Sequence, residues 1–304
     1  MIAIDLGSNS FRCIEYDCDT KIFGRSFERI VKTADKMHET GLISEGALQR
    51  VTEALKEADA LLNFENHNVK AVTTQAMRMA SNAQEILESI QEASGVLFKI
   101  INSDEEARLT LLAVEARLKA LSIRSEHFVL IDVGGGSTEV IFYKNQKMVS
   151  QSFPIGIVTT AQVCDDGEVI EDYLDKKFQE VEHFVQQHYS SSGKPDIFVA
   201  TAGTPTTMAA YLLGMNYKNY DVEKINGYKL SLAGTQKSLD GLMSLSEVQR
   251  SEIVGVGRES LILAGIVIVQ KLYDTLGFSE AIVIDDGVRE GVAIASCNER
   301  QKKS

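Results

Sequence analysis

The stretch that decides the fold is "IDLGSNSFRCIEY" (Ile4–Tyr16), because it returns in altered form as "IDVGGGSTEVIFY" (Ile131–Tyr143). A gap-free alignment of the two pairs Asp5 with Asp132, Gly7 with Gly134 and Ser10 with Ser137. Each copy predicts a strand, a glycine-rich turn and a second strand, since β-branched, aromatic and alternating apolar residues flank the turn. The chain therefore contains the same hairpin twice.

The segments after each hairpin follow a shared plan. Further strand-like sequence comes first, and helical and strand-like segments then alternate with short connections, a pattern typical of parallel or mixed sheets flanked by helices. One such helix is predicted after Ser44, whose hydroxyl suits an N-cap. The 304 residues exceed a usual single core. We therefore expect an α/β protein of two related domains, divided near residue 120.

Composition limits the partners and the compartment. Acidic residues outnumber basic ones by 43 to 31, and no run of basic residues occurs. Nucleic-acid binding needs clustered Lys and Arg, so no nucleic-acid partner is expected. The N-terminus resembles no signal peptide, and the most apolar later stretch, Leu261–Val269, is too short to span a bilayer and suits a buried helix. We expect a soluble cytoplasmic protein without a membrane partner.

Cysteine and histidine spacing gives no sign of a zinc site. The four cysteines (Cys13, Cys18, Cys164 and Cys297) form no CxxC pair and are expected to be free thiols in a reducing compartment. The five histidines form no HxxxH pair and are expected at the surface.

The two turns suit an anion such as phosphate. Glycine tolerates positive φ and lets a backbone approach a ligand, successive N–H groups can form a nest, and hydroxyls add donors. Asp5 and Asp132 would face the same anion, which requires a hard cation between them, so Mg²⁺ is the expected cofactor. The alternative is that both are only tight turns, where Gly and Ser are common. The candidate phosphate-binding residues are Gly7, Ser8, Asn9, Ser10, Gly134, Gly135, Gly136, Ser137 and Thr138.

Longer motifs resemble one known family. The segments "DLGSNSFR", "TTQAMRMASN", "INSDEEARL", "DVGGGSTE", "TAGTPTTMAA" and "DDGVREG" are similar to signatures of the exopolyphosphatase/guanosine pentaphosphate phosphohydrolase (Ppx/GppA) family. The resemblance extends along nearly the whole chain. It implies a duplicated actin-like (ribonuclease H-like) fold with an interdomain cleft. Domain I would comprise residues 1–120 with 287–304, and domain II residues 121–286.

The resemblance also implies roles for charged residues. It places the catalytic carboxylate at Glu106, with Glu105 as the alternative. It also implies that Arg78 binds a terminal phosphate, a role that suits the bidentate hydrogen bonding of arginine. Two structural interpretations stay open. Ser103 and Glu106 have the spacing of a capping box, and Arg78 suits a salt bridge on a helix surface.

Glu139 is a second catalytic candidate. It corresponds to Arg12 in the first hairpin, so one hairpin offers a carboxylate where the other offers a cation. The alternative is an ordinary charge on an exposed strand. Gly203 and Thr204 follow a strand at a helix N-terminus, where an anion can bind, and they are candidate substrate-binding residues. Asp285 and Arg289 are weaker candidates that suit a link between the last helix and domain I.

Two positions depart from the family pattern. Thr159 stands where members often have Arg, and Ala202 stands where a second glycine is usual. We expect a Mg²⁺-dependent phosphohydrolase that releases terminal orthophosphate from inorganic polyphosphate, with short chains favoured, or from guanosine pentaphosphate (pppGpp). The alternatives are a kinase of the same fold that uses ATP on a small molecule, and a non-catalytic sensor of polyphosphate or guanosine penta- and tetraphosphate. The sequence leaves a homodimer open.

Overall fold

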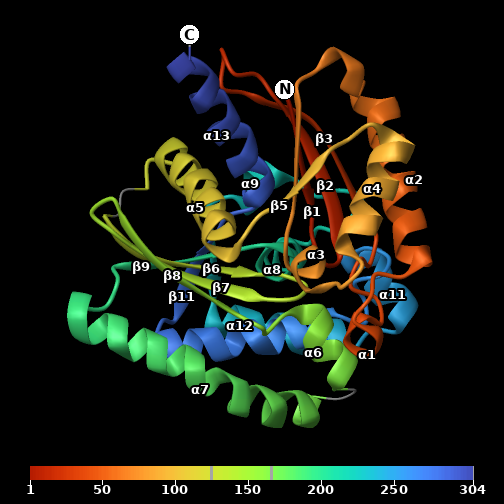
Figure 1. Cartoon of the computed structure of the whole chain (residues 1–304). Coiled ribbons are helices and arrows are strands. Elements are labelled where there is room, and N and C mark those ends of the chain that lie inside the picture. Colours follow the sequence, from red (N-terminus) through yellow and green to blue (C-terminus); the bar gives the residue numbers. More distant parts are fainter. Residues whose placement is uncertain (124–125, 165–166, 304) are drawn as a thin grey trace. The chain divides into compact units, whose positions relative to one another are not determined.

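The computed structural model describes residues 1–123, 126–164 and 167–303, and the chain divides into two compact units (Figure 1). Unit 1 consists of Met1–Val114 with Asp286–Ser304, and unit 2 of Glu115–Asp285. The expected domain boundaries, at residues 120 and 286, stay a prediction.

The described residues of unit 1 form a five-stranded sheet. Its strands are β1 (Ile2–Leu6), β2 (Ser10–Tyr16), β3 (Phe23–Ile30), β4 (Val69–Thr73) and β5 (Phe98–Ile100). Its helices are α1 (Met37–Thr40), α2 (Glu45–Leu62), η1 (Phe64–Asn66), α3 (Gln75–Met79), α4 (Ala83–Ser94), α13 (Val288–Lys303) and α5 (Ser103–Ala120), which continues into unit 2.

The alternation of side chains in β1 builds two apolar layers. Ile2, Ile4 and Leu6 pack into the layer that α2 and α4 cover, whereas Ala3 packs into the layer formed with α13. Figure 1 shows α2 and α4 on one side of this sheet and α13 with α5 on the other. The predicted N-cap of α2 is confirmed, because the Ser44 side chain accepts a hydrogen bond from the Ala47 N–H.

The described residues of unit 2 form a six-stranded sheet. Its strands are β6 (His127–Val133), β7 (Thr138–Lys144), β8 (Lys147–Phe153), β9 (Ile197–Thr201), β10 (Tyr228–Ser231) and β11 (Glu280–Val283). Its helices are α6 (Ile157–Val163), α7 (Gly167–Ser192), α8 (Gly203–Leu212), α9 (Val222–Ile225), α10 (Leu232–Met243), α11 (Glu247–Val254) and α12 (Ile262–Leu276).

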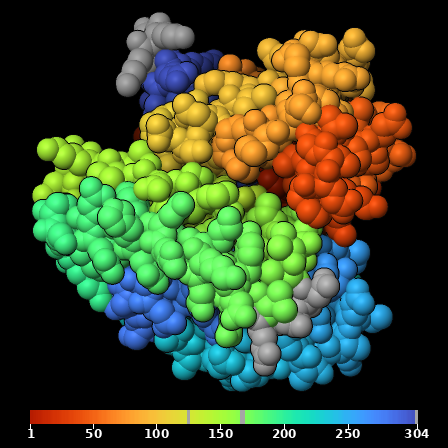
Figure 2. Space-filling model, turned by 60° about the horizontal axis from the view of Figure 1, so that its bottom comes forward, coloured from red at the N-terminus to blue at the C-terminus, as the bar shows by residue number. Residues whose placement is uncertain are grey.

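Helix α12 is the centre of the unit 2 core. Most of its side chains are buried, which confirms the expectation of a buried helix at this apolar stretch. Helix α7 packs against α12 and runs along the surface of unit 2, where it is drawn in green in Figure 2. Among the described helices, none combines the length and the apolar character needed to cross a membrane.

The internal repeat extends from the hairpin to the whole sheet. Unit 1 has the order β3-β2-β1-β4-β5, and unit 2 has the equivalent order β8-β7-β6-β9-β11 with β10 added at the end. In both units the first strand pairs antiparallel with the second and parallel with the strand that follows the hairpin region. The predicted duplication of an α/β fold with mixed sheets is confirmed.

Two of the four cysteines are not free thiols, so that expectation was wrong. Cys18, directly after β2, forms a disulfide with Cys297 of α13 inside unit 1. Their sequence separation of 279 residues gave no signal of a pair, because only folding brings their Cα atoms to 5.4 Å. Cys13 and Cys164 are buried thiols outside this disulfide, and burial raises the pKa of Cys13 to about 12.

One histidine is in the core, which corrects the expectation of surface histidines. His188 of α7 is buried and stacks on Phe142 with ring centroids 3.9 Å apart. Burial lowers the pKa of His188, and the charges of His127 and Lys144 lower it further. Burial and Lys144 also lower the pKa of His127, while Asp196 opposes that shift.

We expect unit 2 to lose stability as the pH falls through the ordinary histidine range. The folded state binds fewer protons at His188 than the unfolded state does, so the free energy of unfolding decreases below a pH of about 6.5. Urea unfolding between pH 7.5 and 5.5 measures this slope. His188→Gln is expected to flatten it, whereas His183→Gln, at an exposed site on the same helix, is the matched control. An equal slope in both variants would contradict the assignment.

Candidate active site

The candidate residues of unit 1 gather at one edge of its sheet. Strands β1, β4 and β5 run parallel, and ligands of open α/β sheets bind beyond the carboxyl ends of such strands. The first turn follows β1, α3 follows β4, and α5 follows β5. The Thr73 hydroxyl donates to the Leu6 carbonyl (2.8 Å), and the Ile101 N–H donates to the Thr73 carbonyl (3.0 Å), so the three strand ends are tied together.

The turn between β1 and β2 is held by backbone hydrogen bonds. Gly7 N–H donates to the Ser10 carbonyl at 2.9 Å, and the Asn9 carbonyl accepts from the N–H groups of Val31 and Lys32. The Asn9 side chain is buried, and within the described residues its Oδ1 has no hydrogen-bond partner. A buried acceptor without a partner suits a cation or a ligand group that donates a hydrogen bond, because a buried polar group without a partner is destabilising.

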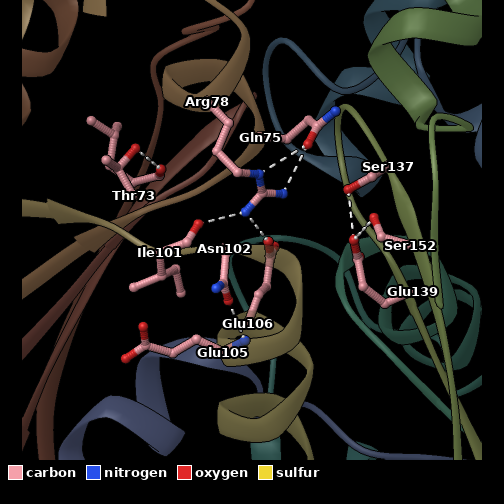
Figure 3. A network of polar contacts seen from close by, with 11 residues as sticks. Thr73, Gln75, Arg78, Ile101, Asn102, Glu105, Glu106, Ser137, Glu139 and Ser152 are labelled. Carbon is pink, nitrogen blue, oxygen red and sulfur yellow. Dashed lines mark hydrogen bonds and ion pairs between the residues drawn. The ribbon is translucent and has the colours of Figure 1, made fainter. Parts of the chain in front are cut away.

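Arg78 forms the central polar contact of unit 1 (Figure 3). Its Nη1 donates to Glu106 Oε2 (2.7 Å) and to the Ile101 carbonyl (2.8 Å), and its Nε and Nη2 donate to Gln75 Oε1. The side chains of Arg78 and Glu106 are only 15% and 10% exposed. The pair is therefore largely shielded from solvent and is no surface salt bridge.

The alternative interpretation of Ser103 and Glu106 as a capping box was wrong. The cap is Asn102, whose Oδ1 accepts the Glu105 N–H at 2.8 Å, while Ser103 is already the first residue of α5. Glu106 is therefore directed to Arg78 and not to the helix end. Glu105, the alternative carboxylate, forms an exposed ion pair with Lys99.

The turn between β6 and β7 repeats the geometry of the first turn. Gly134 N–H donates to the Ser137 carbonyl at 2.9 Å, as Gly7 does to Ser10. Neither Gly7 nor Gly134 has a positive φ, so the expected use of glycine for positive φ was wrong at these positions. Close approach of two backbones requires glycine at Gly156. A Cβ on Gly156, before α6, would lie 2.3 Å from the Gly135 carbonyl oxygen.

Glu139 is buried and held by two hydroxyl groups. Its Oε1 accepts from Ser137 Oγ (2.8 Å) and from Ser152 Oγ (2.7 Å) of β8 (Figure 3). The alternative of an exposed strand charge was therefore wrong. Thr138, next in the chain, is also buried.

Asp132 lies directly opposite Glu139 in the β6–β7 register, whereas Asp5 lies opposite Arg12 in the first hairpin. Two like charges opposite each other, such as Asp132 and Glu139, destabilise a strand pair, whereas the opposite charges of Asp5 and Arg12 attract. Carboxylate oxygens are the ligands that Mg²⁺ prefers, so the unit 2 pair fits a divalent cation. Among the described residues, no group of three or more His, Cys, Asp or Glu side chains is arranged to hold a metal ion.

The remaining candidates lie beyond β9 and β11. Gly203 and Thr204 begin α8, and Thr204 is buried where Gly265 of α12 leaves room for its hydroxyl. Asp285 follows β11 and accepts a hydrogen bond from the Tyr220 hydroxyl, while Arg289 of α13 pairs with Glu290. A pocket of about 320 Å³ between α7 and α12 includes Asp175, Glu182 and Asp274, so its charge does not suit phosphate.

Comparison with known proteins decides the family. The model of the Ppx/GppA phosphatase family matches residues 24–299. This chain belongs to the Ppx/GppA phosphatase family. It is therefore a hydrolase of acid anhydride bonds, which favours the phosphohydrolase over the kinase and the sensor.

Relatives of the Ppx/GppA family cover almost the entire chain. Exopolyphosphatase 2 of Mycobacterium tuberculosis is 24% identical over 319 residues, which is 96% of this chain and 97% of its own. The solved structure of the Aquifex aeolicus Ppx/GppA enzyme is 31% identical with a TM-score of 0.74, over 97% of this chain and 98% of that one. An exopolyphosphatase from Cytophaga hutchinsonii, 22% identical with a TM-score of 0.84 over 97% of both chains, shares the fold. The predicted actin-like fold class is confirmed.

Ala202, the position where the family resemblance predicts glycine, has an unusual backbone conformation. Ala202 has φ 73° and ψ −177°, a region that glycine alone occupies without strain. We expect Ala202→Gly to raise the free energy of unfolding by about 1 kcal/mol. Chemical denaturation measures the change. Ala210→Gly, inside α8, is the control and should lower stability by about 1 kcal/mol, whereas destabilisation by Ala202→Gly would contradict the strain.

Sequence reasoning missed three residues of the site. The side chains of Gln75 and Ser152 bond the charged groups of Arg78 and Glu139, and the Asn102 side chain accepts the backbone N–H of Glu105. Gln75 precedes Arg78 by three residues, a spacing that places both on one helix face and was a usable signal. Ser152 had no local signal, because its place opposite Glu139 depends on the β7–β8 register.

Proposed function

We propose that this Ppx/GppA phosphatase removes terminal orthophosphate from short inorganic polyphosphate or from the triphosphate end of pppGpp. The buried contact between Arg78 and Glu106 at the carboxyl edge of the unit 1 sheet is the observation that carries the proposal. Phosphoanhydride hydrolysis needs an oriented water and a carboxylate to position it, and Glu106 is the carboxylate that the fold fixes most firmly at this edge.

The chain's own residues have distinct roles in this proposal. Glu106 accepts a hydrogen bond from the attacking water and takes its proton, with Arg78 fixing the carboxylate. Backbone and hydroxyl groups of the turns bind phosphate oxygens, and the side-chain N–H groups of Asn9 donate to them as well. Ser137 and Ser152 orient Glu139. That the two turns clamp one phosphate chain, with Gly203 and Thr204 as further contacts, stays a prediction.

Ppx/GppA phosphatases generally depend on a divalent metal ion. We propose Mg²⁺, with Asp132 as a ligand and Glu139 beside it, and with Asp5 as the ligand from the first hairpin. The ion, when bound, would neutralise charge on the phosphate oxygens. Asp132→Asn is expected to lower the Mg²⁺ affinity and the activity together, and a Mg²⁺ titration of the activity measures both. An unchanged titration would remove Asp132 from the metal site.

The experiment that tests the function is orthophosphate release from polyphosphates of several lengths and from pppGpp, with and without ADP or ATP. Phosphate release without nucleotide is the expected result, whereas nucleotide-dependent transfer would indicate a kinase and binding without turnover a sensor. With no run of basic residues in the chain, KM per chain end should depend little on length or salt. Much tighter, salt-sensitive binding of long chains would contradict the preference for short ones.

A further inference from the structure

We infer that Gln75 is a positioning residue that acts through Arg78 on Glu106. The inference rests on the proposed role of Glu106 as the catalytic carboxylate. It also gives Arg78 a different task from the phosphate contact expected above. In this arrangement Arg78 fixes Glu106, and Gln75 fixes Arg78.

The hydrogen bonds of Arg78 occupy two edges of its guanidinium group. Gln75 Oε1 accepts from Nε at 3.2 Å and from Nη2 at 2.8 Å. Nη1 donates to the Ile101 carbonyl at 2.8 Å and to Glu106 Oε2 at 2.7 Å. Because the guanidinium is planar and its five N–H bonds form a rigid fork, fixing both edges fixes the direction in which Nη1 points.

These contacts leave no edge of Arg78 for bidentate phosphate binding. Such binding needs two parallel N–H groups on one edge. The edge of Nε and Nη2 is occupied by Gln75, and both hydrogens of Nη1 are used. Within the part of the chain that the structure describes, only one Nη2 hydrogen lacks a partner. Arg78 is therefore arranged to hold a carboxylate rather than to grip a phosphate group.

The supports of this arrangement are rigid parts of the fold. Gln75 and Arg78 are three residues apart on α3, which places both side chains on one face. The Ile101 carbonyl is fixed because the Ile101 N–H is bonded to the Thr73 carbonyl at the end of β4. Arg78 and Glu106 are mostly buried, so water cannot easily take the place of a lost hydrogen bond, and the loss is costly.

Removing the acceptor at residue 75 should therefore misplace Glu106. Gln75→Met keeps the length and apolar stem of the side chain but leaves Nε and Nη2 of Arg78 unbonded. We expect kcat to fall by about tenfold and KM to stay within about twofold, because the error concerns the reacting carboxylate and not the substrate contacts. Gln75→Glu keeps an acceptor for both N–H groups and should retain most of the activity.

The experiment measures kcat, KM and thermal stability for these variants of the full chain. Gln84→Met is the matched control, because Gln84 lies on α4 and bonds only the exposed Glu88. In a Glu106→Gln background, Gln75→Met is expected to cause no further loss of the residual turnover, since its effect runs through Glu106.

Three outcomes, besides an unchanged kcat in Gln75→Met, would overturn the inference. The first is a fall in kcat from Gln75→Met that multiplies with the fall from Glu106→Gln in the double variant. The second is an effect of Gln75→Met on KM alone. The third is a folded Gln75→Glu variant whose kcat is as low as that of Gln75→Met. The proposed function fails differently. If Glu106→Gln keeps wild-type turnover, then Glu106 is not the catalytic carboxylate. If Glu106→Gln is inactive and Gln75→Met is as active as Gln84→Met, only the positioning role is wrong.

Discussion

Glu106→Gln is expected to lower kcat by about a thousandfold or more while the protein remains folded. Glutamine has the size of glutamate and can still accept a hydrogen bond from Arg78 Nη1, which in the native chain donates to Glu106 at 2.7 Å. It cannot take a proton from water. Because Arg78 stays charged and loses its anionic partner, some stability is lost as well. Single-turnover release of orthophosphate and thermal unfolding measure the two effects separately.

The neighbouring carboxylate provides the comparison for this experiment. Glu105 is one residue away on the same helix, but its side chain pairs with the exposed Lys99. Glu105→Gln should therefore change kcat by no more than about twofold, since exposed ion pairs contribute little. A strong loss in Glu105→Gln together with an active Glu106→Gln would transfer the catalytic role to Glu105.

Gly291→Ala should cause a large loss in the free energy of unfolding, although it adds only one methyl group. A Cβ on Gly291 of α13 would lie 2.0 Å from the Leu109 carbonyl oxygen and 2.5 Å from its carbonyl carbon, both backbone atoms of α5. Backbone cannot yield as a side chain does, so α13 must move away from α5. We expect a loss of about 3 kcal/mol or more in the free energy of unfolding.

The matched control lies at the start of the same helix. A Cβ on Gly287 would meet no atom within 4 Å, and Gly287→Ala should change stability by no more than about 1 kcal/mol. Urea unfolding of both variants, with the disulfide between Cys18 and Cys297 intact, compares them directly. Equal free energies of unfolding in the two variants would mean that α13 can move away from α5 without losing stability. The activity of Gly291→Ala also reports on Glu106, which precedes Leu109 by one turn of α5.

The fold was predictable because its signal is repeated. The hairpin at Ile4–Tyr16 and its copy each fix a strand pair, and the helical segments have lengths and periodicities that local propensity resolves. The turn and the carboxylates of the candidate site were also visible as motifs. Their chemistry still awaits the tests described above.

The errors came from features that depend on distant or alternative contacts. The pair of Cys18 and Cys297 joins segments that are far apart in sequence, and His188 becomes buried only when α7 packs on the sheet. At Ser103 the local pattern fitted a capping box, but Asn102, one residue earlier, supplies the cap and leaves Glu106 for Arg78. Neither Asn102 as the cap nor Arg78 as the partner of Glu106 was predicted from the sequence, and the second contact joins residues 28 positions apart.

Unit 1 is completed by a segment that is synthesised after unit 2. Its first 114 residues leave the ribosome before α13 exists, so the apolar face formed by Ala3, Ile14 and Val72 then lacks the helix that covers it. Unit 2 is continuous in sequence, and all of its described strands are synthesised before α13. A truncated chain that ends before Asp286 would expose this face and also lack Cys297. Such products present the unburied apolar surface that chaperones and proteases recognise, so cellular quality control can distinguish chains that lack α13 from chains that contain it.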